Sequence, residues 1–276
     1  MTSPKKPSAV LVYAGLLAGA LVTLAPFVLG LLTSFTSAHQ FATGTPLSWP
    51  RPPTLTNYAN LGGAGFGRAL AVTTLMTAVI LLGQISSSVL AAYAFARLRF
   101  PGRDALFWVY LATLMVPGSV TVVPLYLMMA QLGLRNTFWA LVLPFVFGSP
   151  YAIFLLRQHF RTIPTELDDA ARVDGAGHLR IIRHVIVPMS WPAISAVMVI
   201  TGQYIWNDFF WPNLYINTTT RMTAPLALYN LESTAGGGPI GAVFAGLSVL
   251  CVPCVIGFIF LQRRLMEGIG YRGISR

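Results

Sequence analysis

Long runs of apolar residues without charge alternate along this chain with short polar segments. A helix that crosses the hydrocarbon core of a bilayer needs about 20 such residues. Six runs are close to that length, at residues 9–32, 69–95, 105–131, 136–156, 189–210 and 240–261. The pattern therefore predicts an all-α, polytopic membrane protein whose six transmembrane helices form a single domain over residues 1–276.

The third run, 105–131, contains helix-breaking residues. The Pro117-Gly118 pair and Pro124 lie inside it. Proline has no backbone donor and clashes with the preceding turn, so a break in a membrane is tolerated only where neighbouring helices or a cavity cover it. We expect a kink or break in this run, and a plain bend and a flexible segment lining a pathway are both compatible with it.

The composition supports a membrane protein. Hydrophobic residues make up 55% of the 276 residues, and only 9% are charged, whereas a soluble domain has roughly a quarter charged residues. The net charge of +10 is typical of nucleic-acid-binding proteins. Here, however, the basic residues cluster between apolar runs instead of covering one soluble face, so we expect no nucleic-acid partner.

The basic residues also predict the orientation in the membrane. With the N-terminus in the cytoplasm, most of the Lys and Arg residues fall on the cytoplasmic side of a six-helix topology, as the positive-inside rule requires. The cytoplasmic set is Lys5, Lys6, Arg97, Arg99, Arg103, Arg157, Arg161, Arg172, Arg180, Arg183, Arg263, Arg264, Arg272 and Arg276, and the external set is Arg51, Arg68, Arg135 and Arg221. Both termini and the polar segment 160–188 are therefore expected in the cytoplasm.

The polar segment 160–188 has an unusual concentration of acidic residues and is expected to contain a short helix. Thr165 is placed to cap the first turn, with Asp168 three residues later as in a capping box. Gly175 is expected to end the helix in a left-handed conformation. Four of the eight acidic residues of the chain lie within nine positions, namely Glu166, Asp168, Asp169 and Asp174.

One face of this helix is narrow and made of small residues. Leu167, Ala170, Ala171 and Asp174 share it by their spacing of three and four residues. Such a short helix is marginal alone in water, so it must dock on something. A lipid surface favours basic helices with large apolar anchors. The acidic, alanine-rich character therefore favours docking on a partner protein over lying on lipid.

The spacing within this segment resembles the EAA loop of ABC importer permeases. The family pattern is Glu-Ala-Ala, three residues, Gly, nine residues, then Ile-x-Leu-Pro. This sequence has Asp169-Ala170-Ala171, three residues, Gly175, nine residues, then Val185-Ile186-Val187-Pro188. Asp replaces Glu, and Val replaces Ile and Leu. The resemblance implies that the segment couples to an ATPase through Glu166, Leu167, Asp169, Ala170, Ala171, Asp174, Gly175 and Pro188.

Three further segments are similar to the carbohydrate-uptake branch of this family, in particular to the smaller permease of maltose-type importers. They are AYAFARLRFPGRDALFW at 92–108, IWNDFFWPNL at 205–214 and QRRLMEG at 262–268. The last residues depart from the usual family ending, which puts a contact of the tail with the ATPase in doubt. The likeness covers most of the chain from about Ala69 onward.

The resemblance implies a function and a set of partners. The chain would form half of the translocation pathway for a sugar or sugar-like solute, such as an oligosaccharide, an amino sugar or a glycerophospho-compound. A second permease, two ATPase subunits and an extracytoplasmic solute-binding protein would complete the importer in a bacterial plasma (inner) membrane. ATP and Mg would bind to the ATPase subunits, so no cofactor is expected in this chain.

Candidate solute-pathway residues are Tyr204, Trp206, Asn207 and Asp208, at the end of the fifth run. Aromatic faces stack on sugar C–H groups, and amides bind hydroxyl groups, but the same residue types also occur in interfacial packing. Asp208 is compatible with an interfacial position in contact with water and with a polar role in the pathway. Both interpretations stay open.

Enzymatic chemistry is not expected. The sequence has no G-x-x-x-x-G-K-[ST] motif, and its four histidines lack metal-ligand spacing, so we expect neither catalytic nor metal-binding residues. Cys251 and Cys254 form a C-x-x-C inside an apolar run and are expected to be buried thiols. The alternative function is a stand-alone secondary transporter or channel for a small polar solute. That class needs ionisable groups at mid-membrane, which the six runs nearly lack.

Overall fold

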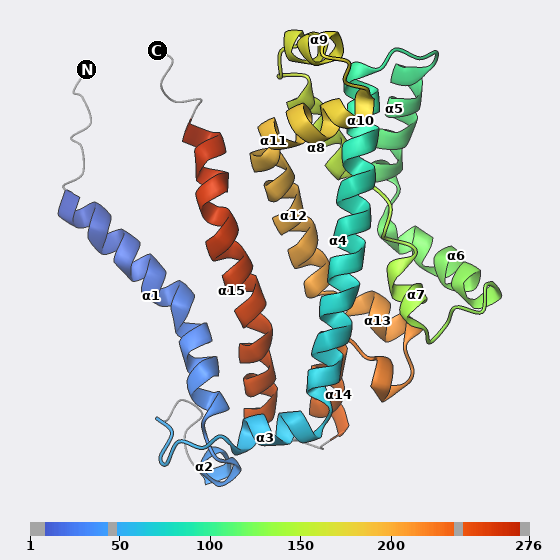
Figure 1. Cartoon of the computed structure of the whole chain (residues 1–276). Coiled ribbons are helices and arrows are strands. Elements are labelled where there is room, and N and C mark those ends of the chain that lie inside the picture. The colour runs from blue at the N-terminus through green and yellow to red at the C-terminus, as the bar shows by residue number, and fades with distance from the viewer. Residues whose placement is uncertain (1–8, 44–48, 235–239, 271–276) are drawn as a thin grey trace, which may run out of the picture. The chain divides into compact units, whose positions relative to one another are not determined.

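The computed structural model describes residues 9–43, 49–234 and 240–270, and every regular element in these ranges is a helix (Figure 1). The chain divides into two compact units, Met1–Gly67 with Leu228–Val252, and Arg68–Ala227 with Pro253–Arg276. The all-α expectation is confirmed. The single-domain expectation stays a prediction. Lys5, Lys6, Arg272 and Arg276, used to orient the chain, lie outside the described residues.

Three helices in the described ranges are long and apolar enough to cross a membrane by themselves. They are α1 (Ala9–Ser34), α4 (Phe66–Arg97) and α15 (Ile240–Gly270), with candidate spans at Val10–Ser34, Phe66–Arg97 and Ile240–Phe260. They coincide with the first, second and sixth predicted runs. No residue in the most apolar window of α1 is buried, as expected for a helix that faces lipid.

The third run is broken, as its proline pattern predicts. It forms α5 (Arg103–Ala112), the short 3₁₀ helix η1 (Thr113–Met115) and α6 (Gly118–Gln131), and the two arms meet at an angle of 97°. The break falls at Val116, which is extended with ψ of 116° and directly precedes Pro117. Proline excludes its preceding residue from the helical region, so the bend follows from the local sequence.

The fifth run is the second arm of another bent pair. Helix α10 (His178–Ile181), the π-helix η2 (Ile182–Ile186) and α11 (Val187–Met189) form the first arm. The second arm begins with α12 (Trp191–Trp206) at an angle of 81° and continues into α13 (Phe210–Tyr215). If each bent pair is one span, the described residues contain up to five candidate spans.

The fourth run, 136–156, is not one continuous helix. It contains α7 (Phe138–Val142) and the first part of α8 (Pro150–Phe160). Pro144 follows α7 closely, and Pro150 fixes the start of α8, where the Ser149 hydroxyl accepts a hydrogen bond of 3.1 Å from the Ala152 backbone N–H. Two prolines thus divide the run into short helices, and a separate span here stays a prediction.

The first unit is held together by polar contacts at the end of α1. Helices α2 (Ala38–Thr43) and α3 (Thr56–Gly63) belong to it, with the end of α14 (Ala224–Thr234) and the first part of α15. The buried Asn57 side chain of α3 donates hydrogen bonds of 2.8 Å to the backbone carbonyls of Ser34 and Thr36. The bond to Ser34 satisfies a carbonyl that the end of α1 leaves free.

The second unit has two apolar cores, and α4 contributes to both. Val89 and Tyr93 of α4 pack with Phe160 in one core. Met76 and Ile80 of α4 pack in the other. The remaining elements of this unit are α9 (Glu166–Val173) and η3 (Thr219–Arg221). Helix α4 therefore contributes to both cores, as does α12, with Ile194 in the first core and Ile205 in the second.

Candidate functional site

The acidic helix α9 begins at the predicted residue, but the predicted cap is wrong. Thr165 occupies the N-cap position with helical dihedral angles, and its side chain makes no capping hydrogen bond. Its backbone carbonyl instead accepts bonds from the N–H groups of Asp168 and Asp169. Asp168 also does not serve a capping box, because its side chain turns inward to Arg97.

Arg97, the last residue of α4, forms a buried ion pair with Asp168. The Arg97 Nε atom lies 3.2 Å from Asp168 Oδ2, and the two side chains are only 5% and 4% exposed. Arg97 Nη2 also donates a hydrogen bond of 2.7 Å to the backbone carbonyl of Ile163. Nothing in the local sequence marks this pair, since its members are far apart in the chain, and it was missed by the sequence interpretation.

The predicted end of α9 at Gly175 is confirmed. Gly175 has φ of +77°. Its N–H bonds to the Arg172 carbonyl at 2.9 Å, and the Ala176 N–H bonds to the Ala171 carbonyl at 2.9 Å. This is the Schellman arrangement, in which a left-handed residue lets two terminal carbonyls find donors.

The side chains predicted to share one face of α9 separate into two groups. Ala171 is partly buried and packs against the core that contains Tyr93, whereas Leu167, Ala170 and Asp174 are exposed. Asp168 and Asp169 are adjacent and therefore project from different sides of the helix. Asp168 is buried, whereas Asp169 is exposed and lies 3.5 Å from Arg172. Glu166 and Pro188 are also exposed.

Large apolar side chains are exposed on α9 and shortly after it. Val173 is 88% exposed and Leu179 is 73% exposed, with Leu167 at 39%. We call Leu167, Val173 and Leu179 the exposed apolar set. Exposed apolar side chains mark candidate sites of protein or membrane contact where they form one surface.

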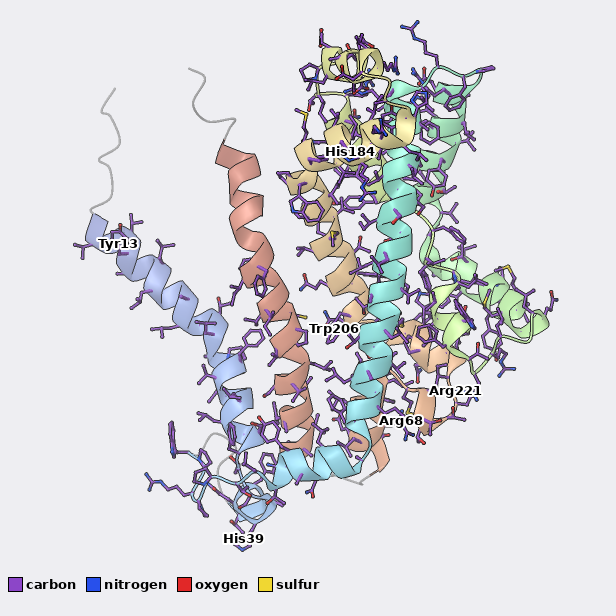
Figure 2. All side chains as sticks on the ribbon, in the orientation of Figure 1. Tyr13, His39, Arg68, His184, Trp206 and Arg221 are labelled. Carbon is purple, nitrogen blue, oxygen red and sulfur yellow. The ribbon has the colours of Figure 1, made fainter. Side chains whose placement is uncertain are left out.

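His178 ties the segment after α9 to α4. The hydroxyl of Tyr93 and His178 Nδ1 are 3.1 Å apart and share a hydrogen bond, with the two rings 5.9 Å apart. His184, on the next turns, has its Nδ1 3.1 Å from the Arg180 carbonyl (Figure 2). Helix α9 is therefore connected to α4 on both of its sides.

The four candidate solute-pathway residues do not line one cavity. Tyr204 and Asp208 line a cavity of about 360 Å³ between α4, α8 and α12, together with Gln84. Trp206, labelled in Figure 2, is buried and lines a different cavity of about 450 Å³ with Thr77 of α4 and Cys254 of α15. Asn207 is exposed, and its Nδ2 donates 2.8 Å to the Gln203 carbonyl.

Asp208 caps a helix, whether it lies at the membrane interface or in the solute pathway. Its Oδ1 accepts hydrogen bonds from the backbone N–H groups of Phe210, at 3.0 Å, and Trp211, at 3.4 Å. These are the first free donors of α13, so the carboxylate caps this helix.

Metal-binding chemistry is not indicated by the part of the chain that the structure describes. No group of three or more His, Cys, Asp or Glu side chains there is arranged to hold a metal ion. Cys254 is partly buried, but Cys251 is exposed, so the expected burial of both thiols is wrong for Cys251. Its side chain lies on a surface of α15 that the described residues leave uncovered.

These features define a polytopic helical membrane protein with broken spans, cavities and an exposed acidic helix, which is the general plan of a transport permease. Comparison with known families makes the assignment specific. Residues 84–266 match the family described as binding-protein-dependent transport system inner membrane component, and the chain belongs to this family. It is thus the membrane permease of an ABC importer, and the family is one of transport components, not of enzymes.

A curated relative and two solved structures agree with this assignment. The chain is 32% identical over 262 residues to the sn-glycerol-3-phosphate transport system permease protein UgpE of Yersinia pestis bv. Antiqua (strain Antiqua), covering 92% of this chain and 93% of UgpE. Its fold is similar to a chain of a bacterial ABC transporter for import of the acidic polysaccharide alginate, with TM-score 0.81, 23% identity and coverage of 95% and 99%. A structure of a bacterial alginate ABC transporter in complex with alginate pentasaccharide-bound periplasmic protein gives TM-score 0.62, 17% identity and coverage of 92% and 93%.

Proposed function

We propose that this permease forms half of the pathway for a sugar or sugar-like solute and that segment 160–188 couples it to separate ATPase subunits. The observation that carries the coupling role is that the Arg97–Asp168 pair holds α9 to α4, while the exposed apolar set on and after α9 is uncovered. An anchored helix with uncovered apolar side chains suits docking on a protein partner. The acidic first turn, with Glu166 and Asp169 exposed, makes an anionic lipid surface a poor partner.

The complete importer contains a second permease, two ATPase subunits that bind ATP and Mg, and an extracytoplasmic binding protein. The membrane is a bacterial inner membrane, and both termini are cytoplasmic. Support for this orientation comes from the distribution of basic residues. Support for a binding protein comes from the family description and from the periplasmic protein bound to the alginate transporter.

The solute class is supported by the cavity that Tyr204 and Asp208 share. Its lining is mainly apolar and includes the Tyr204 ring and the polar side chains of Gln84, Ser149 and Thr201. Such a mixture of aromatic and hydrogen-bonding groups suits a polyhydroxylated solute. Oligosaccharides, amino sugars and glycerophospho-compounds fit this description, and the UgpE relative belongs to a glycerol-3-phosphate system.

Reconstitution tests this function directly. Proteoliposomes that contain the chain with its cognate permease and ATPase, supplied with the binding protein, should accumulate one of three radiolabelled probes: maltotriose, N-acetylglucosamine or glycerol 3-phosphate. Accumulation should require ATP and every subunit. A secondary transporter or channel, the alternative function, would move solute with this chain alone and without ATP, and that result would overturn the proposal.

Introducing a charged residue into the exposed apolar set tests whether this surface docks on the ATPase. Val173→Asp should abolish co-purification of the ATPase with the permease, because a buried unpaired carboxylate is very costly at an interface. Asp169→Ala should weaken the same association by about 1–3 kcal/mol if its charge is desolvated on docking. Leu55→Asp is the matched control, since Leu55 is 68% exposed in the segment predicted to be external. Normal ATPase association of Val173→Asp would exclude the docking role.

A further inference from the structure

Helix α4 runs unbroken through the second unit. It has 32 residues, Phe66–Arg97, whereas the helix pairs that follow it in sequence bend by 97° and 81°. Its side chains belong to both apolar cores, with Met76 in one and Tyr93 in the other. A displacement at one end of a straight, packed helix reaches the other end, because packed interiors deform little.

The C-terminal end of α4 holds segment 160–188 at three points. Arg97 bonds to the Ile163 carbonyl before α9 and pairs with Asp168 inside α9. Tyr93, one turn earlier on α4, shares a hydrogen bond with His178 after α9. Helix α9 is thus fixed to α4 before its first residue, in its first turn and after its last residue.

Besides these polar contacts, Ala171 of α9 packs against the apolar core. The helix has only eight residues, which is too short for stability in isolation. Asp168 is the only residue of α9 that is buried. Removing one member of a buried ion pair leaves the other charged and desolvated, so the position of α9 depends on Arg97.

Helix α4 lines both of the cavities described above. Thr77 and Leu81 of α4 line the cavity that contains Trp206. Gln84 lines the cavity that contains Tyr204, and its Nε2 donates 3.4 Å to the Phe145 carbonyl. Its Oε1 is buried without a hydrogen-bond partner in the described structure. A shift of α4 would therefore move side chains in both cavities together.

We propose that Arg97 is a positioning residue that fixes α9 to α4, so that the two helices move as one rigid body when the ATPase acts. Helix α4 then carries the movement of the docked α9 to the cavity side chains Thr77 and Gln84. This inference rests on the proposed coupling role of segment 160–188. The competing mechanism is a swivel, in which the Arg97–Asp168 pair separates during transport.

A reversible cross-link separates the two mechanisms. In a Cys251→Ser/Cys254→Ser background, Arg97→Cys and Asp168→Cys are joined by a short bis-methanethiosulfonate reagent. The polar cavity of about 720 Å³ beside Arg97 and Asp168 gives the reagent access. The readout is the coupling ratio, the solute transported per ATP hydrolysed by the assembled importer in proteoliposomes, with maltotriose, N-acetylglucosamine and glycerol 3-phosphate as probes.

The unlinked double-cysteine importer should have a coupling ratio roughly tenfold below that of the background. Cross-linking should restore the ratio, and reduction should lower it again. A swivel predicts the reverse, with the linked importer blocked. Blocked transport after linking, or full coupling of the unlinked form, would overturn the inference.

Single variants keep the inference testable if the double-cysteine protein does not assemble. Arg97→Met and Asp168→Asn should each lower the coupling ratio about tenfold, and the double variant should lose no more than either single variant, because both act through one interaction. Arg97→Lys should recover part of the ratio, since it keeps the charge but cannot reach both Asp168 and Ile163. Additive losses, or no loss in the single variants, would overturn the inference.

Arg99→Met is the matched control. Arg99 is exposed two residues beyond Arg97 and makes no ion pair in the described part of the chain. The coupling ratio of the Arg99→Met importer should therefore equal that of the background. The wild-type importer separates the two proposals. If it shows no ATP-dependent uptake with all subunits present, the proposed function fails; if it transports and the Arg97 variants stay coupled, only the rigid-body inference fails.

Discussion

Gly83 of α4 lies directly against Val146. A Cβ atom at Gly83 would stand 2.4 Å from Val146 Cγ2 and 2.6 Å from the Val146 carbonyl oxygen. A second close approach follows one turn later, where a Cβ at Gly148 would lie 2.8 Å from the Ser88 hydroxyl. The proline-interrupted segment between α7 and α8 is therefore laid along α4 at a separation that only glycine permits.

We expect Gly83→Ala to destabilise the protein by about 1–3 kcal/mol, because a backbone carbonyl must move to admit the methyl group. The measurement is the thermal midpoint of the purified importer in detergent. Gly67→Ala is the control on the same helix, since nothing lies within 4 Å of its Cβ position. That variant should be neutral or slightly stabilising, because alanine favours helix. Equal stability of the two variants would contradict the close packing.

The left-handed end of α9 gives a second prediction. Gly175→Ala should cost about 1 kcal/mol, because a Cβ at positive φ is strained. The loss falls on the segment proposed to couple to the ATPase, so we expect less transport per ATP hydrolysed with normal membrane insertion. Gly177→Ala is the matched control, because Gly177 has φ of −76° and an open Cβ position. Wild-type transport by Gly175→Ala would show that the end of α9 does not affect coupling.

The cap on α13 distinguishes the two interpretations of Asp208. Asp208→Ala should lower stability by about 1 kcal/mol, as expected for loss of a side-chain cap. Asp208→Asn retains an oxygen acceptor for the Phe210 and Trp211 N–H groups, so we expect near-normal stability and near-normal transport. Uptake assays and thermal unfolding measure the two properties. A stable Asp208→Asn importer without transport would instead assign the charge to the solute pathway.

Thiol labelling tests the orientation in the membrane. Single cysteines at Arg99 and His178, in a Cys251→Ser/Cys254→Ser background, should be shielded from an impermeant thiol reagent in intact cells. A cysteine at Thr220 should react. All three positions are exposed in the structure, so protection must come from the membrane and not from burial. Labelling at His178 from outside would contradict the six-span topology.

The sequence predicts best what depends on neighbouring residues. The break at Pro117 and the stop at Gly175 both follow from local backbone chemistry, and both occur where they were expected. Hydrophobic length predicts α1, α4 and α15 for the same reason, because each is a continuous apolar run. The short helices in 136–156 show where length alone is insufficient, since prolines divide a run that is apolar enough to span.

Local sequence patterns did not predict contacts between segments that are far apart in the chain. Asp168 has the spacing of a capping residue, and only the folded chain brings Arg97 to its side. The candidate pathway residues are close in sequence, but Tyr204 and Trp206 line different cavities because residues two positions apart on an α-helix lie about 200° apart. Adjacency on a helix therefore predicts separation, not a shared site.

The π-helix at Ile182–Ile186 has a consequence for how this chain is compared with its relatives. A π turn contains one extra residue, so it rotates everything before it by about 100° relative to an uninterrupted α-helix. The nine residues between Gly175 and Val185 include the first three residues of this turn, 182–184. A homologue with one residue fewer in that interval would point the helix equivalent to α9 in a different direction from the same span, and an alignment gap there would mark a changed helix orientation instead of a neutral loop deletion.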